Sequence, residues 1–252
     1  MTETALNRNT GKLSAKDRLI VALDVSTLAE AESWMAKLSG EVGMFKVGLE
    51  LFTSCGTALF DVVKKHKAKL FFDGKFHDIP NTVSGASKAA VRNGCDMFNI
   101  HALGGRRMMT AAAEACRETA ESLGLSTRPA LIAVTILTSM SPEALKADLQ
   151  IEKPLADMVP FLASLAKECG LDGVVASAQE AGRIRESVGD DFLIVTPGIR
   201  PAFASSDDQA RIVTPAEAIK SGADYIVVGR PILKAENPVE AARKVVEELA
   251  SV

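Results

Sequence analysis

Three charged side chains lie at the end of an apolar run in the stretch KLFFDGKFHDIPNTV, residues 69–83. Asp73 and Lys75 are two residues apart, and Asp78 follows three residues after Lys75. Charged groups are rarely buried without a partner, because removing them from water is costly. Acids and bases that alternate can stay ionised by pairing with one another. The stretch therefore predicts either a functional site or a structural network of ion pairs.

The elements that must position these residues are short β-rich runs that alternate with alanine-rich segments of helical spacing. LAEAESWMAKL, GTALFDVVKKH and PVEAARKVVEELA are such segments. Helix start signals agree: Thr214 with Pro215 and Glu217 predicts a capping box, and Asn237 precedes a second Pro-initiated helix. Eight β-rich runs occur, at residues 19–25, 43–49, 69–76, 96–102, 129–137, 173–177, 192–199 and 225–232.

Strands that alternate with helices predict a parallel sheet. Eight such units in about 235 residues fit a (β/α)8 TIM barrel, which typically has about 250 residues, better than a doubly wound sheet. No linker or change of composition divides the chain. We therefore expect an α/β fold with a flexible tail at residues 1–17 and a single barrel domain at residues 18–252.

Barrel geometry predicts that the charged residues meet at one opening. Asp24 ends the first β-rich run, Lys46 lies in the second, and Asp73 and Lys75 lie in the third. Side chains two apart on a strand share a face, and the C-terminal ends of barrel strands carry the active site. We expect the side chains of these four residues to lie around this opening, the mouth of the barrel, and Asp78 to lie on the loop after the third run. An ion network that only plugs the barrel is the structural alternative.

A second group of residues predicts a phosphate-binding site. Gly229 and Arg230 directly follow the eighth run, and Arg200 and Gln209 lie in the long polar loop after the seventh. Barrels often bind phosphate with these two loops, and arginine grips phosphate oxygens through paired hydrogen bonds. Long polar loops are often lids. The alternative is a surface arginine beside a tolerated insertion.

Composition excludes several other classes. The net charge is −3 and aromatic residues make up 5% of the 252 residues, which disfavours a nucleic-acid surface. The four cysteines are scattered and indicate reduced thiols of a cytoplasmic protein. The polar N-terminus lacks a signal-peptide core, and no apolar run reaches membrane-spanning length. The three histidines are spread along the chain, so we expect no metal site.

Several motifs together resemble the orotidine 5′-phosphate decarboxylase family, in its bacterial form. They are VALDV, FKVGLELF, FFDGKFHDIPNTV, VTILTSM, LDGVVASAQE, TPGIRP and VVGRPI, and they occur in the family's order from about residue 18 to the C-terminus. One departure is Gly74, where many members carry a larger apolar residue. It faces away from Asp73 and Lys75, so it bears on local packing rather than on the chemistry.

The resemblance implies roles for individual residues. Lys75 matches the proton-donating lysine, Asp73 the acid beside it, and Lys46 completes the charged array. Asp78 matches an acid that members contribute to the neighbouring subunit's site, which implies a homodimer with shared active sites. The substrate-binding matches are Asp24, Lys46, Asp73, Thr82, Thr138, Arg200, Gln209, Gly229 and Arg230.

The implied reaction is the decarboxylation of orotidine 5′-phosphate to UMP, the last step of pyrimidine nucleotide synthesis. Loss of CO2 leaves a carbanion in the ring plane, and no cofactor motif offers an electron sink. We therefore expect no cofactor and a fixed electrostatic environment instead. Two alternatives stay open. One is a Mg²⁺-dependent sugar-phosphate lyase or aldolase of the related barrels, and the other is a barrel that binds nucleotides without catalysis.

Overall fold

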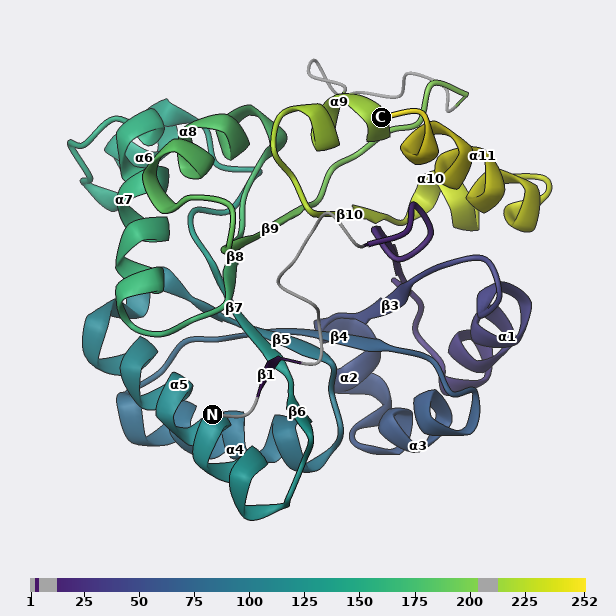
Figure 1. The fold of residues 1–252 in the computed structure, drawn as a ribbon, viewed down its shortest axis with the longest axis horizontal. Helices are drawn as coiled ribbons and strands as arrows, with labels where there is room; N and C mark the ends of the chain where they lie inside the picture. The colour runs from purple at the N-terminus through teal and green to yellow at the C-terminus, as the bar shows by residue number, and fades with distance from the viewer. Residues whose placement is uncertain (1–2, 5–12, 204–212) are drawn as a thin grey trace.

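The strands of the chain close into a parallel barrel, and helices surround it (Figure 1). The structure is a computed structural model, and it describes residues 3–4, 13–203 and 213–252. The barrel order is β10-β2-β3-β4-β5-β7-β8-β9 with every pairing parallel. The prediction of a (β/α)8 barrel is confirmed. Its strands are β2 (Leu19–Ala22), β3 (Met44–Val47), β4 (Leu70–Phe76), β5 (Met97–His101), β7 (Ala130–Val134), β8 (Gly173–Val175), β9 (Leu193–Thr196) and β10 (Tyr225–Val228).

The helices begin where the sequence provides caps. Thr214 accepts a hydrogen bond from the Glu217 backbone at the start of α9, with a complete capping box, and Asn237 caps α11 through Glu240. The described helices are α1 (Leu28–Leu38), α2 (Leu49–Cys55), α3 (Ala58–Lys65), α4 (Pro80–Arg92), α5 (Gly105–Ser122), α6 (Pro142–Leu149), α7 (Leu155–Glu168), α8 (Ala178–Val188), α9 (Pro215–Lys220), α10 (Arg230–Leu233) and α11 (Pro238–Ala250), with a 3₁₀ turn η2 (Ala102–Gly104).

The core has two parts, because alternate residues of a barrel strand face opposite sides. One part lies between the strands and the helices, and it includes Phe45, Phe72 and Phe98. The other part fills the barrel interior with Ile20, Ala22, Met44, Phe71, Met97, Ala130, Ile132, Leu193, Val195, Tyr225 and Val227. The interior is therefore packed, and chemistry is left to its ends.

A short ribbon lies outside the barrel. β1 (Glu3–Thr4) pairs in parallel with β6 (Thr127–Arg128), which directly precedes β7 and so lies at the N-terminal end of the barrel. Most of residues 1–17 falls outside the described ranges, so the flexible tail and the domain boundary at residue 18 stay predictions. Among the described helices, none combines the length and the apolar character that crossing a membrane requires.

Candidate active site

A chain of ion pairs crosses the C-terminal ends of the first three barrel strands. Nζ of Lys75 lies 2.6 Å from Oδ1 of Asp73, and Nζ of Lys46 lies 3.2 Å from Oδ2 of Asp73. Lys46 also reaches Oδ1 of Asp24 at 3.3 Å. The structure thus brings together the four mouth residues that the sequence predicted, in the order Asp24, Lys46, Asp73, Lys75.

The two-residue period of the strands explains why these side chains meet. Met44 and Phe71 point into the apolar interior of the barrel, and two residues further along the same strands stand Lys46 and Asp73. The same step on β5 leads from Met97 to Asn99, a polar residue with no exposed surface. The packed interior therefore ends in a polar layer at the mouth.

The backbone of β4 is irregular at this point. Phe72 pairs with Phe98 and Phe76 pairs with Ile100, so three residues of β4 face a single residue of β5. Lys75 has a φ of 50°, in the left-handed region that lysine seldom occupies. Such conformations cost of order 1–3 kcal/mol and cluster at functional sites. The irregularity aims Lys75 at Asp73 and leaves its side chain partly open to solvent.

Asp73 is the electrostatic centre of the array. Burial alone would raise the pKa of its carboxyl group, but the ammonium groups of Lys46 and Lys75 offset that effect. Hydrogen bonds from Lys75 and Asn99 act in the same direction, so the pKa of Asp73 lies below its ordinary value. The carboxylate is therefore ionised at neutral pH and holds two lysinium groups beside it.

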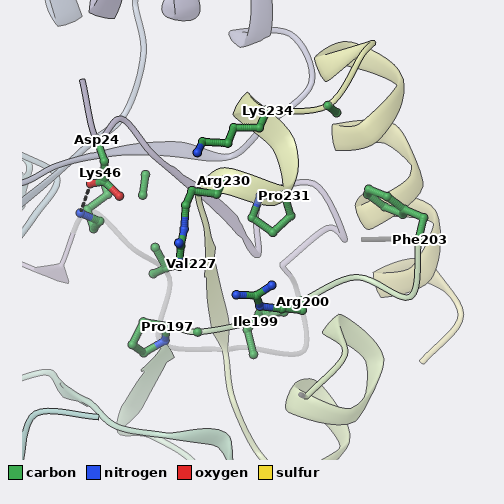
Figure 2. A pocket seen from close by; sticks show the side chains of 14 residues that line it. Asp24, Lys46, Pro197, Ile199, Arg200, Phe203, Val227, Arg230, Pro231 and Lys234 are labelled. Carbon is green, nitrogen blue, oxygen red and sulfur yellow. Dashed lines mark hydrogen bonds and ion pairs between the residues drawn. The ribbon is translucent and has the colours of Figure 1, made fainter. Parts of the chain in front are cut away.

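A cavity of about 490 Å³ adjoins this array (Figure 2). Its wall comes from the ends of β2, β3, β9 and β10 and from α10. A Cβ atom on Gly229 would lie 3.5 Å from Oδ2 of Asp24, so glycine leaves this side of the cavity open. The lining residues are Ala22, Asp24, Lys46, Pro197, Gly198, Ile199, Arg200, Phe203, Val227, Gly229, Arg230, Pro231, Lys234 and Ala235.

The cavity is suited to an anion. Arg200, Arg230, Lys234 and Lys46 contribute four cationic side chains against the single carboxylate of Asp24. The side chains of Arg200, Arg230 and Lys234 gather around the same space (Figure 2). Because Lys46 lines the cavity and also pairs with Asp73, a ligand in the cavity can extend to the charged array.

Sequence reasoning missed two residues of this region. Lys234 lies four residues after Arg230, and that spacing puts both on one side of a helical turn. Asn99 lies two residues after the interior-facing Met97 on β5, just as Lys46 and Asp73 lie two residues after interior-facing residues on β3 and β4. The spacing in MFNIH was the available signal, but an amide stands out less than a charge in an apolar run.

Other predicted residues do not line the cavity. Asp78 is exposed on the loop after β4, and its Oδ1 accepts the backbone N–H of Ile79 at 2.6 Å. Thr82 is exposed near the start of α4, and Thr138 is exposed in the turn after β7. Within this chain these three residues do not join the array. Gln209 lies outside the described residues, so its predicted role stays a prediction.

Two histidines lie beside the array. The rings of His77 and His101 have centroids 5.4 Å apart. Burial lowers the pKa of His101, and the neighbouring His77 and Lys75 lower it further. Neutral His101 is thus a packing neighbour of the cations rather than another charge. Across the described ranges, no three or more His, Cys, Asp and Glu side chains form a group that could hold a metal ion.

Fold and site together are those of a barrel enzyme with a cation-rich cavity beside a lysine–carboxylate array. Residues 17–245 match the model of the orotidine 5′-phosphate decarboxylase / HUMPS family, and the chain belongs to this family. Proteins named orotidine 5′-phosphate decarboxylase from Syntrophotalea carbinolica and Trichlorobacter lovleyi are similar to it. The first is 54% identical over 95% of this chain and 97% of its own length, and the second is 55% identical over 94% and 97%.

Solved structures agree with the family assignment. The crystal structure of orotidine 5′-phosphate decarboxylase from Lactobacillus acidophilus has a TM-score of 0.79 and 37% identity, and the alignment covers 92% of this chain and 98% of that one. An uncharacterized conserved protein from Geobacillus kaustophilus has a TM-score of 0.81 and 42% identity, with 92% and 99% coverage. The resemblance that the sequence motifs indicated is confirmed.

Proposed function

We propose that this chain decarboxylates orotidine 5′-phosphate to UMP without a cofactor, with Lys75 as the proton donor. The observation that carries the assignment of residues is the continuity from the cationic cavity through Lys46 to Asp73 and Lys75. Family membership and relatives above 50% identity support the reaction itself.

The substrate carries a phosphate group and a pyrimidine carboxylate, and the site offers a cationic cavity and a charged array to receive these two ends. The phosphate would bind in the cavity at Arg200, Gly229 and Arg230, with the ribose hydroxyls near Asp24 and the pyrimidine toward Asp73 and Lys75. Gln209, Thr82 and Thr138 complete the proposed substrate contacts. Phosphate binding is remote from the reacting carbon, so its binding energy can be used to assemble the charged site.

The bond changes balance without a redox partner. The bond between C6 and the carboxylate breaks, CO2 leaves, and the electron pair stays on C6 in the ring plane. The Lys75 ammonium, 2.6 Å from Asp73, stabilises this charge and then transfers its proton to C6. Solvent reprotonates the amine. Asp73 holds the ammonium in place before the reaction, and Lys46 in turn holds Asp73.

The direct test follows the ultraviolet absorbance of orotidine 5′-phosphate with the purified protein, before and after exhaustive chelation. We expect full turnover in both cases. Activity that is lost with EDTA and restored by Mg²⁺ would favour a metal-dependent member of the family. Binding of UMP without any turnover would favour a nucleotide-binding barrel.

We also propose that the active unit is a homodimer in which Asp78 completes the partner's site. Asp78 is exposed, and its carboxylate accepts a hydrogen bond from the adjacent backbone rather than joining the array of its own chain. Large apolar side chains are exposed just after three consecutive strands, at Leu49, Ile79 and Leu103. A second copy covering this face would bury them and bring in the carboxylate of Asp78.

Subunit mixing tests the shared site. Inactive Asp78→Ala and inactive Lys75→Ala proteins, mixed and allowed to exchange, form heterodimers with one doubly altered site and one intact site. Random exchange should restore up to about a quarter of wild-type activity. Exchange that is demonstrated by a mass label, but restores no activity, would place Asp78 in its own chain's site.

We also propose that the protein acts in the cytoplasm. The reaction consumes one nucleotide and produces another, and its natural setting is the cytoplasm. The four cysteines are free in the structure, which is usual in a reducing compartment.

A further inference from the structure

We infer that Asn99 is a positioning residue for the decarboxylation, because its amide fixes the catalytic lysine's backbone and the carboxylate beside it at the same time. The inference rests on the proposed function. Asn99 is fully buried on β5 and so lies behind the site rather than in contact with a ligand. It acts on the reaction only through its two hydrogen-bond partners.

Both hydrogen bonds of Asn99 end on the reacting array. Oδ1 of Asn99 accepts the backbone N–H of Lys75 at 2.7 Å. Nδ2 of Asn99 donates to Oδ1 of Asp73 at 2.7 Å. That carboxylate oxygen also accepts from Nζ of Lys75 at 2.6 Å, so backbone, amide, carboxylate and ammonium form a closed ring of contacts.

The chemistry of the partners fixes the orientation of the amide. A backbone N–H can only donate, so it must meet the amide oxygen, and an ionised carboxylate can only accept, so it must meet the amide nitrogen. Burial, the cations of Lys46 and Lys75 and these hydrogen bonds leave the pKa of Asp73 below its ordinary value, so the carboxylate remains an acceptor. An asparagine fits both demands without adding a charge to the array.

The irregular strand explains why a side chain is needed here. The regular pairing of β4 with β5 stops after Phe72 and resumes at Phe76, and Asn99 is the β5 residue opposite the gap. The backbone of Lys75 has a φ of 50° within that gap. The amide oxygen of Asn99 therefore takes the place of the missing strand partner and stabilises the conformation that directs Lys75 toward Asp73.

The first test replaces Asn99 with alanine. Loss of both bonds should release Lys75 and Asp73 from their relative geometry, and a displacement of about 1 Å can lower kcat about 10²-fold. The dissociation constant of UMP should change less than about threefold, because Asn99 does not line the cavity that holds the proposed phosphate site. Ser87→Ala is the matched control, since it removes a buried hydroxyl that donates to the Val83 carbonyl in α4.

The second test is Asn99→Asp, which keeps the shape of the side chain but removes the amide group that donates to Asp73. Two carboxylates at this distance cannot both be ionised, so Asp73 and the carboxyl group introduced at position 99 would share a proton at low pH. The shared proton restores a donor toward Asp73, and rising pH removes it. The ratio of variant to wild-type kcat should therefore fall at least tenfold between about pH 5 and about pH 9. Lys46 from β3, Lys75 from β4 and His101 from β5 are the other titratable groups beside the pair.

The outcomes separate this inference from the proposed function. A kcat within about threefold of wild type in Asn99→Ala, while Lys75→Ala is inactive, would overturn the inference and leave the proposed function intact. If Asn99→Ala does not fold, Asn99→Asp decides, and a kcat–pH profile parallel to that of wild type overturns the inference. A wild-type protein that does not act on orotidine 5′-phosphate overturns both.

Discussion

The two ends of the barrel both carry charged side chains, but they use them differently. At the N-terminal end, Arg128 donates two hydrogen bonds to Asp172, at 2.6 and 2.8 Å, and Asp172 also accepts the backbone N–H of Leu131. Asp224 pairs with Arg185 at 3.0 Å and accepts the backbone N–H of Ile194. These carboxylates directly precede a strand and bind the backbone of its neighbour.

At the C-terminal mouth the charges are only partly satisfied within the chain. The side chain of Asp24 is 58% exposed and that of Lys75 is 30% exposed, whereas that of Asp172 has no exposure. The mouth also contains the unusual backbone of Lys75 and a cavity with an excess of cations. Buried, fully paired charges therefore connect strands to one another, whereas the partly exposed charges of the mouth remain able to bind a ligand. We expect alterations at the mouth to change activity and alterations at the other end to change stability.

Lys75→Ala should change activity far more than it changes stability, and this difference should be the largest of those predicted. Removing the proton donor and its charge should lower kcat about 10⁴-fold or more, equivalent to about 5.4 kcal/mol. The free energy of unfolding should fall only modestly, because Asp73 loses one ion pair but keeps its pair with Lys46 and its hydrogen bond from Asn99. Substrate turnover and urea unfolding measure the two quantities. A near-normal kcat would contradict the assigned chemistry.

Binding of UMP provides the control for this variant. The cavity residues Arg200, Gly229 and Arg230 are unchanged in Lys75→Ala, so calorimetry should still detect the complex. Loss of UMP binding together with activity would mean that Lys75 acts in binding rather than in proton transfer.

Arg128→Leu should show the opposite pattern. It leaves the fully buried Asp172 without its cation, and breaking a buried pair of this kind costs about 3–5 kcal/mol of unfolding free energy. The kcat per folded molecule should not change. Arg106→Ala is the matched control, because it breaks a solvent-exposed pair with Glu168 that contributes little to stability. If Arg128→Leu lowered kcat without lowering stability, the N-terminal end of the barrel would serve activity as the mouth does, and the comparison would fail.

The sequence predicted the fold well because the signals for it are repeated. All eight β-rich runs contain a barrel strand, and the segments at residues 28–38 and 238–250 coincide with α1 and α11. Strand ends were less predictable. The run at residues 192–199 extends past the end of β9 at Thr196, because apolar residues of the mouth loop, such as Ile199, are also buried.

The site was predictable where charge interrupted an apolar run, as at Asp73 and Lys46. It was not predictable where the signal lay in the backbone. Regular alternation suggested that Asp73 and Lys75 share a face, and they do meet, but through an irregular strand with a left-handed lysine. Alternation did place Gly74 correctly, since a Cβ atom there would lie 2.9 Å from the Phe76 ring and 3.0 Å from that of Phe72.

Arg230→Ala tests the mouth at its other side. Loss of a charged hydrogen-bond donor to the proposed phosphate should lower kcat/KM about 10²-fold. Stability should be nearly unchanged, because Arg230 is exposed. Lys234→Ala should have a smaller effect of about tenfold, because an ammonium cannot bind two oxygens in parallel. Arg243→Ala, which removes an exposed arginine paired with Glu41 outside the cavity, is the control. Equal losses in all three variants would indicate a general charge effect.

The smallest expected effect is the dependence of folding stability on pH in the acid range. The carboxyl groups at the two ends of the barrel should contribute to it with opposite signs. At the mouth, burial raises the pKa of Asp73, but the nearby cations and hydrogen bonds together outweigh it, and the pKa lies below the ordinary 3.8. Its stabilising contribution is present above pH 3.8 and is lost only as the pH falls through the lower, folded pKa. At the other end, burial outweighs the effect of Arg185, so the pKa of Asp224 is raised. The stability of the folded state then decreases as pH rises from 3.8 through the raised pKa.

Urea unfolding of Asp224→Asn and Asp73→Asn between about pH 4.5 and about pH 7 separates these cases. The asparagine variants lack the titration, so each difference from wild type reports one carboxyl group. The destabilisation caused by Asp224→Asn should be greater at the acid limit than at neutral pH, because a larger fraction of wild-type Asp224 is protonated there and the buried charge is then less costly. The destabilisation caused by Asp73→Asn should stay constant, because Asp73 is ionised over this whole range. If the cost of Asp224→Asn instead grew toward neutral pH, Arg185 would outweigh burial, and the carboxylates of both ends would be stabilised in the same way.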